Sequence, residues 1–242
     1  DLEANSMYAY AERACLIQIS TADADFILDP LADLDLSGLG DIVANPAVEK
    51  VFHAAEYDLI LMRRDYGWHL HNLFDTMWAA RILGYKQFGL AGMLEGAFGV
   101  RLSKRFQKAN WCHRPLSPGE LAYAQKDTHY LPGLRDRLAA ELAARGLLTE
   151  ALETFAEQSR VKMPNSGFDP DAFWHINGVF DMNPTQQAAL KALYAFRDRE
   201  ARRRNAPHFK VLGDQTLLEV ATRLPARLSE LDAIHGMTSG QQ

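Results

Sequence analysis

The stretch 14–20, ACLIQIS, decides the class of fold. Its central apolar residues predict a short buried β-strand. Apolar runs at 26–28 and 48–54 predict two further strands. Segments with apolar residues at helical spacing follow these strands. An α/β domain with a mixed sheet is therefore expected over residues 1–150.

Capping residues mark the helix boundaries in this half of the chain. Ser117 is expected to be an N-cap, with Glu120 closing a capping box. Asp75 is expected to cap another helix. Pro132 interrupts a long helical pattern, and proline both removes a backbone hydrogen bond and clashes with the preceding turn, so we expect a break near 129–131. The expected helices cover 57–66, 76–83, 90–98 and 118–145.

The second half of the chain is expected to be a small all-helical domain. Residues 151–168 are assigned to a linker, because Pro, Asn, Ser and Gly cluster at its end. The helical domain covers 169–240. Its longest helix is expected at 184–204, Asp214 is expected to cap the next one, and Ser229 to start a last short one.

The composition excludes several classes of protein. The 242 residues are 48% hydrophobic and 24% charged, with a net charge of -5, so the chain is neither disordered throughout nor strongly basic. It has no apolar run long enough for a membrane span. Two cysteines cannot form a disulfide framework or a four-cysteine zinc site. Cys15 is expected to be a buried free thiol, which favours reduced, cytoplasmic surroundings.

Five residues that could carry chemistry stand in three places. Asp1 and Glu3 are two apart, so in a strand both carboxylates point to one face. Tyr123 and Asp127 are four apart and share one face of a helix. Asp58 follows the third predicted strand, where α/β sheets present functional residues. Oxygen ligands of this kind suit hard divalent cations. Each pattern alone is also typical of a solvated acid, a half-buried tyrosine or a helix cap.

Six motifs stand in a characteristic order along the first domain. They are DLE at 1–3, CLIQI at 15–19, VFHAAEYD at 51–58, FDTMWAARILG at 74–84, WCHRPLS at 111–117 and LAYAQKDTHYL at 121–131. Together they resemble ribonuclease D, one of the DEDD 3'-5' exonucleases, in the subgroup with a tyrosine in its third motif. The resemblance covers about residues 1–150 and implies a ribonuclease H-like exonuclease fold.

The resemblance implies a role for each of the five residues. Asp1 would bridge two divalent metal ions, Mg²⁺ or Mn²⁺. Glu3 and Asp127 would complete the shell of the first ion, and Asp58 would support the second, partly through water. Tyr123 would orient the attacking water. The expected activity removes nucleoside 5'-monophosphates from RNA 3' ends, with tRNA precursors or other structured RNAs as substrates.

The C-terminal segment resembles the helicase-and-RNase-D C-terminal (HRDC) domain. The resemblance is carried by LKALYAFRDREARRR at 190–204, NAP at 205–207 and VLGDQTLL at 211–218. It implies a helical bundle that helps bind nucleic acid. The segment 191–210 holds seven basic residues opposed by two acidic ones. Arg202, Arg203 and Arg204 are therefore candidates for phosphate contacts, and a solvated helix face is the alternative.

A loop ahead of the third motif supplies further candidates. In the family this region approaches the substrate, so Gln107, Trp111 and Arg114 are candidate substrate contacts. Arg114 would pair with phosphate. Trp111 would either stack on a base or pack in the core. His53 is expected to pack at a strand end, and Asp75 to act as a helix cap and not as a catalytic acid.

Asp1 is the first residue of the sequence, whereas the family has this aspartate inside a strand. A free α-amino group there would carry positive charge near neutral pH. We therefore expect the chain as written to bind metal less tightly than a version extended upstream. Equal Mg²⁺ dependence of the two would contradict this. The HRDC-like segment is also expected to lack its final helix.

Two other functions remain open from the sequence. A non-catalytic RNA-binding protein would keep the fold and the basic helix but have an impaired metal site. A DNA proofreading type of exonuclease would use the same chemistry. The complete set of five motif residues favours an enzyme, and the C-terminal helical module favours RNA. The sequence indicates no oligomeric state.

Overall fold

The chain divides into two units in a computed structural model that describes residues 1–163 and 167–237. The first unit comprises Asp1–Asn5 and Arg13–Pro164, and the second comprises Ser6–Glu12 and Asn165–Gln242. The first is an α/β domain and the second is helical, as expected from the sequence. Within the described residues no helix is both long and apolar enough to cross a bilayer.

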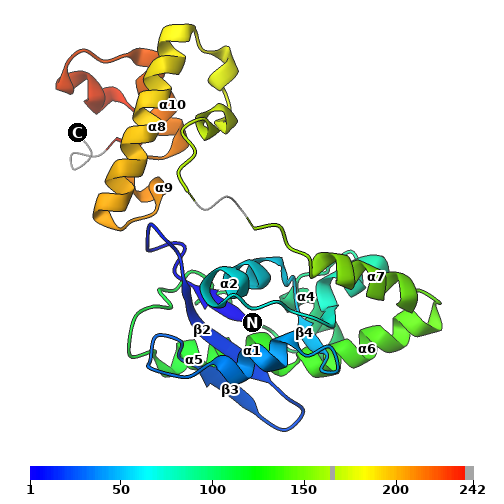
Figure 1. The fold of residues 1–242 in the computed structure, drawn as a ribbon. Coiled ribbons are helices and arrows are strands. Elements are labelled where there is room, and N and C mark those ends of the chain that lie inside the picture. The colour runs from blue at the N-terminus through cyan, green and yellow to red at the C-terminus, as the bar shows by residue number, and fades with distance from the viewer. Residues whose placement is uncertain (164–166, 238–242) are drawn as a thin grey trace. The chain divides into compact units, whose positions relative to one another are not determined.

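The first unit contains two small sheets (Figure 1). Strands β1, β2 and β3 form an antiparallel sheet in that order, and β4 and β5 form a parallel pair. The strand bounds are β1 Leu2–Ala4, β2 Ala14–Ser20, β3 Asp25–Leu28, β4 Lys50–Phe52 and β5 Leu73–Asp75. The helix bounds are α1 Ser37–Ala44, α2 Glu56–Tyr66, α3 Thr76–Ile82, α4 Leu90–Phe98, α5 Pro118–His129, α6 Leu131–Ala144 and α7 Leu148–Gln158. The mixture of parallel and antiparallel strands confirms the expected class of fold.

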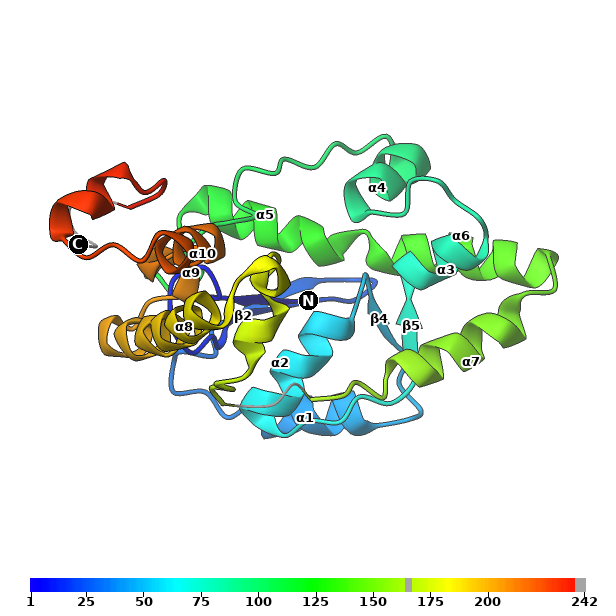
Figure 2. The same cartoon turned by 90° about the horizontal axis from the view of Figure 1, so that it is seen from above.

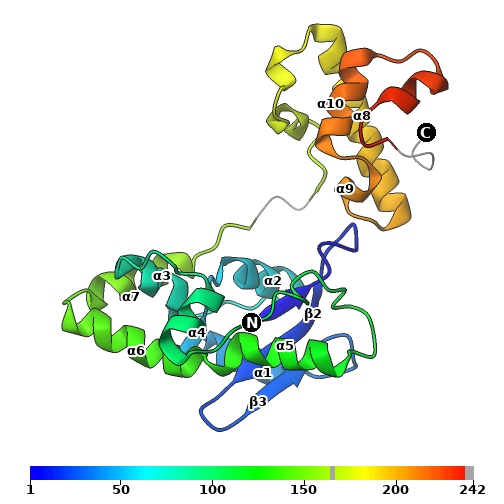
Figure 3. The ribbon, with the colours of Figure 1, turned by 180° about the vertical axis from the view of Figure 1, so that it is seen from behind.

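Helices cover both faces of the antiparallel sheet. Helix α5 packs against β2 and β3 on one face, and α1 and α2 lie on the other (Figures 1 and 3). Figure 2 shows β2 between α5 and α2. Because α5 crosses the sheet beside β1, side chains from the two elements can meet.

Local signals in the sequence predicted most boundaries in this unit. The strand at 14–20 and the helix at 90–98 have the expected bounds. Ser117 accepts a hydrogen bond from the backbone N–H of Glu120, and the capping box is complete. Helix α5 ends at His129 and α6 begins at Leu131, so the expected break is confirmed.

Two helices of the first unit were not expected from the sequence. Helix α1 has few capping signals, with no side-chain cap hydrogen bond at its start. Helix α7 lies across the start of the stretch assigned to the linker. Its Ala151 and Phe155 are buried in the core of the first unit, and the Phe155 ring lies 4.8 Å from the ring of Phe74. Burial of this apolar face, not a strong local signal, explains the helix. Part of the expected linker, 164–166, lies outside the described residues.

The second unit is built around a 21-residue helix, α8 Pro184–Arg204. Asn183 caps it in a capping box with Gln186. The shorter helices are α9 His208–Val211 and α10 Asp214–Arg223, with 3₁₀ helices at Ala172–His175, Val179–Asp181 and Leu228–Ala233. The expected cap at Asp214 is wrong: Gly213 holds that position, and the Asp214 carboxylate accepts a 2.6 Å hydrogen bond from Arg197.

Candidate active site

Three carboxylates from two elements meet at one place. Glu3 lies in the edge strand β1, Asp1 directly precedes that strand, and Asp127 comes from α5. One ligand oxygen of each lies within 4.8 Å of the others. The spacing of two residues puts Asp1 and Glu3 on the same face of the strand, and the packing of α5 on the sheet brings Asp127 to that face. The residues fit a divalent cation, because such ions prefer clustered carboxylate oxygens.

Asp58 lies beside this cluster but outside the group of three. It stands in the first turn of α2 and is 5% exposed. Its Oδ1 accepts a 2.7 Å hydrogen bond from the backbone N–H of Leu2, the residue between Asp1 and Glu3. Asp58 therefore ties α2 to the strand that carries the other two acids, and its second oxygen is not used in that bond.

Without a bound cation, it is unfavourable for all the carboxylates of the cluster to be negatively charged at once. Burial, together with the nearby Asp127 and Asp58 carboxylates, raises the pKa of Glu3 to about 8. Burial raises the pKa of Asp127 to about 7 and that of Asp58 to about 6. These shifts have the direction expected for acids held together away from water. A bound cation would relieve the repulsion.

The α-amino group of Asp1 interacts electrostatically with the carboxylates of Asp58, Asp127 and Glu3. It donates a 3.1 Å hydrogen bond to the carbonyl oxygen of Gln18 on β2. Burial lowers the pKa of this amine, and its positive charge opposes the rise in the pKa of Asp58 and of Asp127. In the chain that starts at Asp1, the amine thus sits among the groups expected to hold metal.

Tyr123 stands one turn before Asp127 on α5. Its ring packs against Trp111 and Phe106, with centroid distances of 5.9 Å and 6.1 Å. Burial and the Asp127 and Glu3 carboxylates raise the pKa of Tyr123 to about 12. Its hydroxyl therefore stays protonated at neutral pH and acts as a hydrogen-bond donor.

The cluster opens into a cleft of about 690 Å³. The cleft is lined by Asp1, Glu3, Tyr123 and Asp127 and also by polar and aromatic side chains from the loops that flank α4. These include Gln107, which was expected from the sequence, and three residues that were not: Lys86, Phe88 and Lys104. No spacing rule marks these three, because they reach the cleft only through the path of their loops.

Two of the candidate substrate contacts have structural partners. Trp111 is 1% exposed, so its ring packs in the core and cannot stack on a base in this structure. Arg114 forms two 2.7 Å hydrogen bonds to the carboxylate of Asp29. Arg114 also donates to the carbonyl oxygens of Trp111 and Cys15. The guanidinium thus holds its loop to β2 and is not presented to a phosphate.

The expectation of a free thiol at Cys15 is wrong. Cys15 on β2 forms a disulfide with Cys112, 97 residues away, and their Cα atoms are 5.0 Å apart. The sequence held no local sign of this pair, because the loop that carries Cys112 reaches β2 only in the folded chain. The argument for reduced surroundings depended on free thiols and therefore no longer holds.

His53 and Asp75 have the structural roles expected of them. Asp75 is 1% exposed and accepts hydrogen bonds from the backbone N–H groups of Ala55 and Met77, at 2.8 Å and 2.9 Å. The Nδ1 atom of His53 lies 2.9 Å from the hydroxyl of Thr76. His53 also lines the cleft, so it contributes to its wall.

The three arginines at the end of α8 are paired with acids of the same helix. Arg202 lies 3.3 Å from Asp198, and Arg203 and Arg204 lie 2.8 Å and 3.0 Å from Glu200. All three side chains remain at least 40% exposed. Their acid partners are much less exposed, at 5% for Asp198 and 18% for Glu200, so moving a guanidinium group to a phosphate would leave a largely buried carboxylate without that partner.

The raised pKa of Glu3 predicts a pH-dependent stability of the metal-free protein. Between the ordinary glutamate pKa near 4.3 and about 8, the folded chain keeps a proton that the unfolded chain has released. The free energy of unfolding should therefore decrease across this window as pH rises. Urea unfolding in EDTA, compared with Glu3→Gln, measures this contribution. A pH-independent difference between the two proteins would contradict it.

A cleft walled by clustered carboxylates and lysines belongs to the class of sites that can cleave phosphodiesters with divalent cations. Comparison with known families agrees: residues 1–143 match the 3'-5' exonuclease family, and residues 186–242 match the HRDC domain. The chain belongs to the 3'-5' exonuclease family.

Relatives of two kinds are similar to nearly the whole chain. An exosome complex component 10 homolog from Caenorhabditis elegans is 38% identical over 93% of this chain and 26% of the relative. Ribonuclease D from Acidiphilium cryptum is 33% identical over 96% of this chain and 59% of the relative. The chain thus spans about a quarter of one curated relative and somewhat over half of the other.

Solved structures agree with the fold. The crystal structure of the catalytic core of RRP6 from Trypanosoma brucei superimposes with a TM-score of 0.87 at 29% identity. The match covers 99% of this chain and 68% of that one. The likeness to ribonuclease D expected from the sequence is therefore shared with the RRP6 group of exonucleases.

Proposed function

We propose that this chain is a metal-dependent 3'-5' exoribonuclease that releases nucleoside 5'-monophosphates from RNA. The observation that carries the proposal is the cluster of Asp1, Glu3 and Asp127 in the wall of a cleft. The family and its ribonuclease relatives support RNA as the substrate. We further propose structured RNA 3' ends, tRNA precursors among them, as natural substrates.

The metal-binding residues would be the four carboxylates. Asp1, Glu3 and Asp127 would share one ion, and Asp1 and Asp58 would bind a second. Two divalent ions, Mg²⁺ or Mn²⁺, would supply an activated water and stabilise the leaving oxygen. The hydrogen bond from Leu2 N–H to Oδ1 of Asp58 holds the carboxylate in place, and Oδ2 is not used in that bond.

Tyr123 would orient the attacking water. Its hydroxyl remains protonated, so it donates a hydrogen bond and does not take a proton. Tyr123→Phe keeps the packing against Trp111 and Phe106 but removes the hydroxyl. We expect the turnover rate to fall by about 100-fold, the lower range for a positioned group of this kind. The substrate KM should change little, and single-turnover rates measured on a labelled RNA would separate the two.

The other cleft residues would hold the strand that leads to the site. Lys86 and Lys104 would offset phosphate charge in a sequence-independent way. Gln107 would supply a polar contact, and Phe88 a face on which a base can stack. These four residues replace Trp111 and Arg114 as the candidates that line the cleft.

The test is 3'-end trimming of a 5'-labelled RNA. With Mg²⁺ present, the proposal predicts a ladder of products shortened one nucleotide at a time, together with nucleoside 5'-monophosphates. EDTA should abolish both. The same assay with a DNA of identical sequence tests the choice of RNA. Binding of RNA without any ladder would contradict the proposal and favour a catalytically impaired RNA-binding protein.

A further inference from the structure

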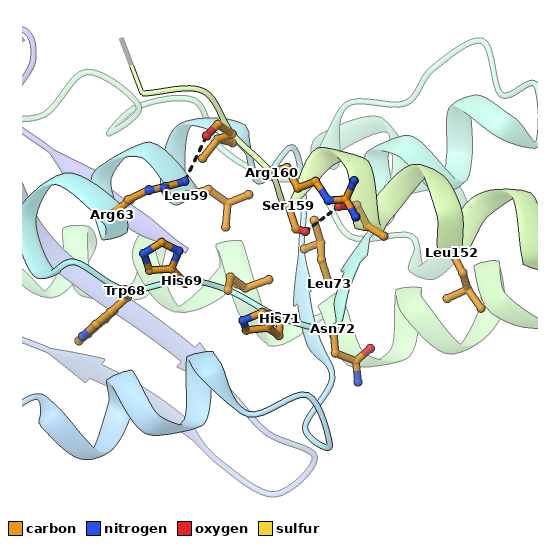
Figure 4. Close-up of a pocket in the computed structure, with 13 residues that line it drawn as sticks. Leu59, Arg63, Trp68, His69, His71, Asn72, Leu73, Leu152, Ser159 and Arg160 are labelled. Carbon is orange, nitrogen blue, oxygen red and sulfur yellow. Dashed lines mark hydrogen bonds between the residues drawn. The ribbon is translucent and has the colours of Figure 1, made fainter. Parts of the chain in front are cut away.

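A second cavity of the first unit lies apart from the active cleft and shares none of its lining residues. It has a volume of about 550 Å³ and lies between α2, the segment that connects α2 to β5, and the end of α7. Figure 4 shows Arg63, His69 and His71 on one side of it, and on the other Leu152 of α7 with Ser159 and Arg160, which directly follow that helix. Two segments about 90 residues apart in sequence therefore form its walls.

The cavity carries only positive or neutral side chains. Arg63 and Arg160 are charged, His69 and His71 become charged on protonation, and none of the thirteen lining residues is acidic. This is unusual in a chain of net charge -5. All four basic side chains belong to exposed residues, so their nitrogen atoms are accessible to a ligand.

The two arginines are weakly engaged. Arg63 donates to the carbonyl oxygen of Val161 at 3.4 Å, a long hydrogen bond, and within the described chain it forms no ion pair with a carboxylate. Arg160 lies 3.3 Å from Glu157, and both side chains are more than 70% exposed. Exposed pairs of this kind are worth little. An anionic ligand can therefore pair with either guanidinium group without breaking a strong interaction.

The floor of the cavity is apolar. Leu59, Leu70 and Leu73 are buried beneath it, and Leu152 on α7 is 46% exposed at its edge. His69 and His71, two residues apart in the segment that connects α2 to β5, also line the cavity. Imidazole rings, guanidinium groups and apolar side chains in one cavity are the kinds of group that hold a base and a phosphate.

We propose that this cavity binds a nucleotide unit, with the phosphate on Arg63 or Arg160 and the base against His69, His71 and the apolar residues of the lining. The ligand is either a free nucleoside monophosphate or one nucleotide of an RNA strand. The site does not depend on the proposed exonuclease activity, because binding requires neither the carboxylates nor a metal ion.

The experiment measures binding in EDTA, which removes the divalent cations expected at the active cleft. The probes are AMP, UMP and a 5'-fluorescein RNA of about ten nucleotides, a length within the usual range of single-strand sites. We expect the double variant Arg63→Ala/Arg160→Ala to weaken binding about tenfold. The variant His69→Ala/His71→Ala should weaken it about fivefold, the lower range for loss of base stacking.

Arg64→Ala is the matched control, because Arg64 is the neighbour of Arg63 on α2 but pairs with Asp65 and does not line the cavity. It should change the Kd by less than about twofold. If the double variants weaken binding of both the monophosphates and the RNA, the cavity is a site for free nucleotides. If they weaken binding of the RNA alone, it is a site for one nucleotide of a strand. Unchanged binding in the double variants, or equal weakening in Arg64→Ala, would overturn the proposal. Trimming of the labelled RNA with Mg²⁺ is measured separately, so each proposal can fail alone.

Discussion

Asp127→Asn is expected to lower the rate of RNA trimming by about 1,000-fold or more. The replacement keeps the size of the side chain but removes one of three carboxylates whose oxygens lie within 4.8 Å of one another. Losing one preorganised charged group at a developing charge costs a factor of about 100 to 1,000. Here the same group is also needed to hold metal, so the effect should lie at the upper end. Single-turnover trimming of a 5'-labelled RNA with Mg²⁺ measures it.

The same variant should not unfold the protein. Burial raises the pKa of Asp127 to about 7, so its charged form is disfavoured by folding, and a neutral amide at this position relieves that cost. Asp127→Asn should therefore be at least as stable as the metal-free parent near pH 8. Asp136→Asn on α6 is the control, because its carboxylate is 74% exposed and pairs only with Arg135. Full trimming activity in Asp127→Asn, or equal loss in Asp136→Asn, would refute the assigned role.

Cys112→Ala is expected to reduce the free energy of unfolding by about 4 kcal/mol. The disulfide from Cys15 to Cys112 closes a loop of 97 residues, and the entropy removed from the unfolded chain increases with loop length. Alanine replaces the sulfur with a small apolar group, so few native contacts change. Urea unfolding without reductant, followed by far-UV circular dichroism, measures the difference.

Reduction of the parent protein supplies the control for this prediction. Dithiothreitol should lower the stability of the parent towards that of Cys112→Ala and should leave the variant unchanged. Equal stability of the variant and the oxidised parent would show that the disulfide does not stabilise the fold. A decrease in the free energy of unfolding of Cys112→Ala on reduction would point to an effect unrelated to this disulfide.

Local signals explain why much of the fold was predictable. Each capping box joins residues three apart, as at Ser117 with Glu120 and Asn183 with Gln186, so the sequence contains both partners. The break before Pro132 likewise depends on the ring of one residue and the turn before it. Helix α7 was missed because it depends on burying Phe155 against residues far away in the chain.

The candidate site divides in the same way. The pairs Asp1 with Glu3 and Tyr123 with Asp127 share a face through the periodicity of a strand and a helix, and motif resemblance placed all five residues. Lys86 and Lys104 were missed because loops with no periodicity carry them to the cleft.

The sequence by itself determined most of the helices, the capping boxes at Ser117 and Asn183 and the two short-range residue pairs of the site. Tertiary structure alone decided which distant groups meet. It placed Asp58 on the N–H of Leu2, 56 residues away, and joined Cys15 to Cys112. It also pairs Arg114 with Asp29, 85 residues away, so the guanidinium group of Arg114 is not available for a phosphate contact. Such partners depend on how α5 and its preceding loop pack against β2, and no local pattern encodes that packing.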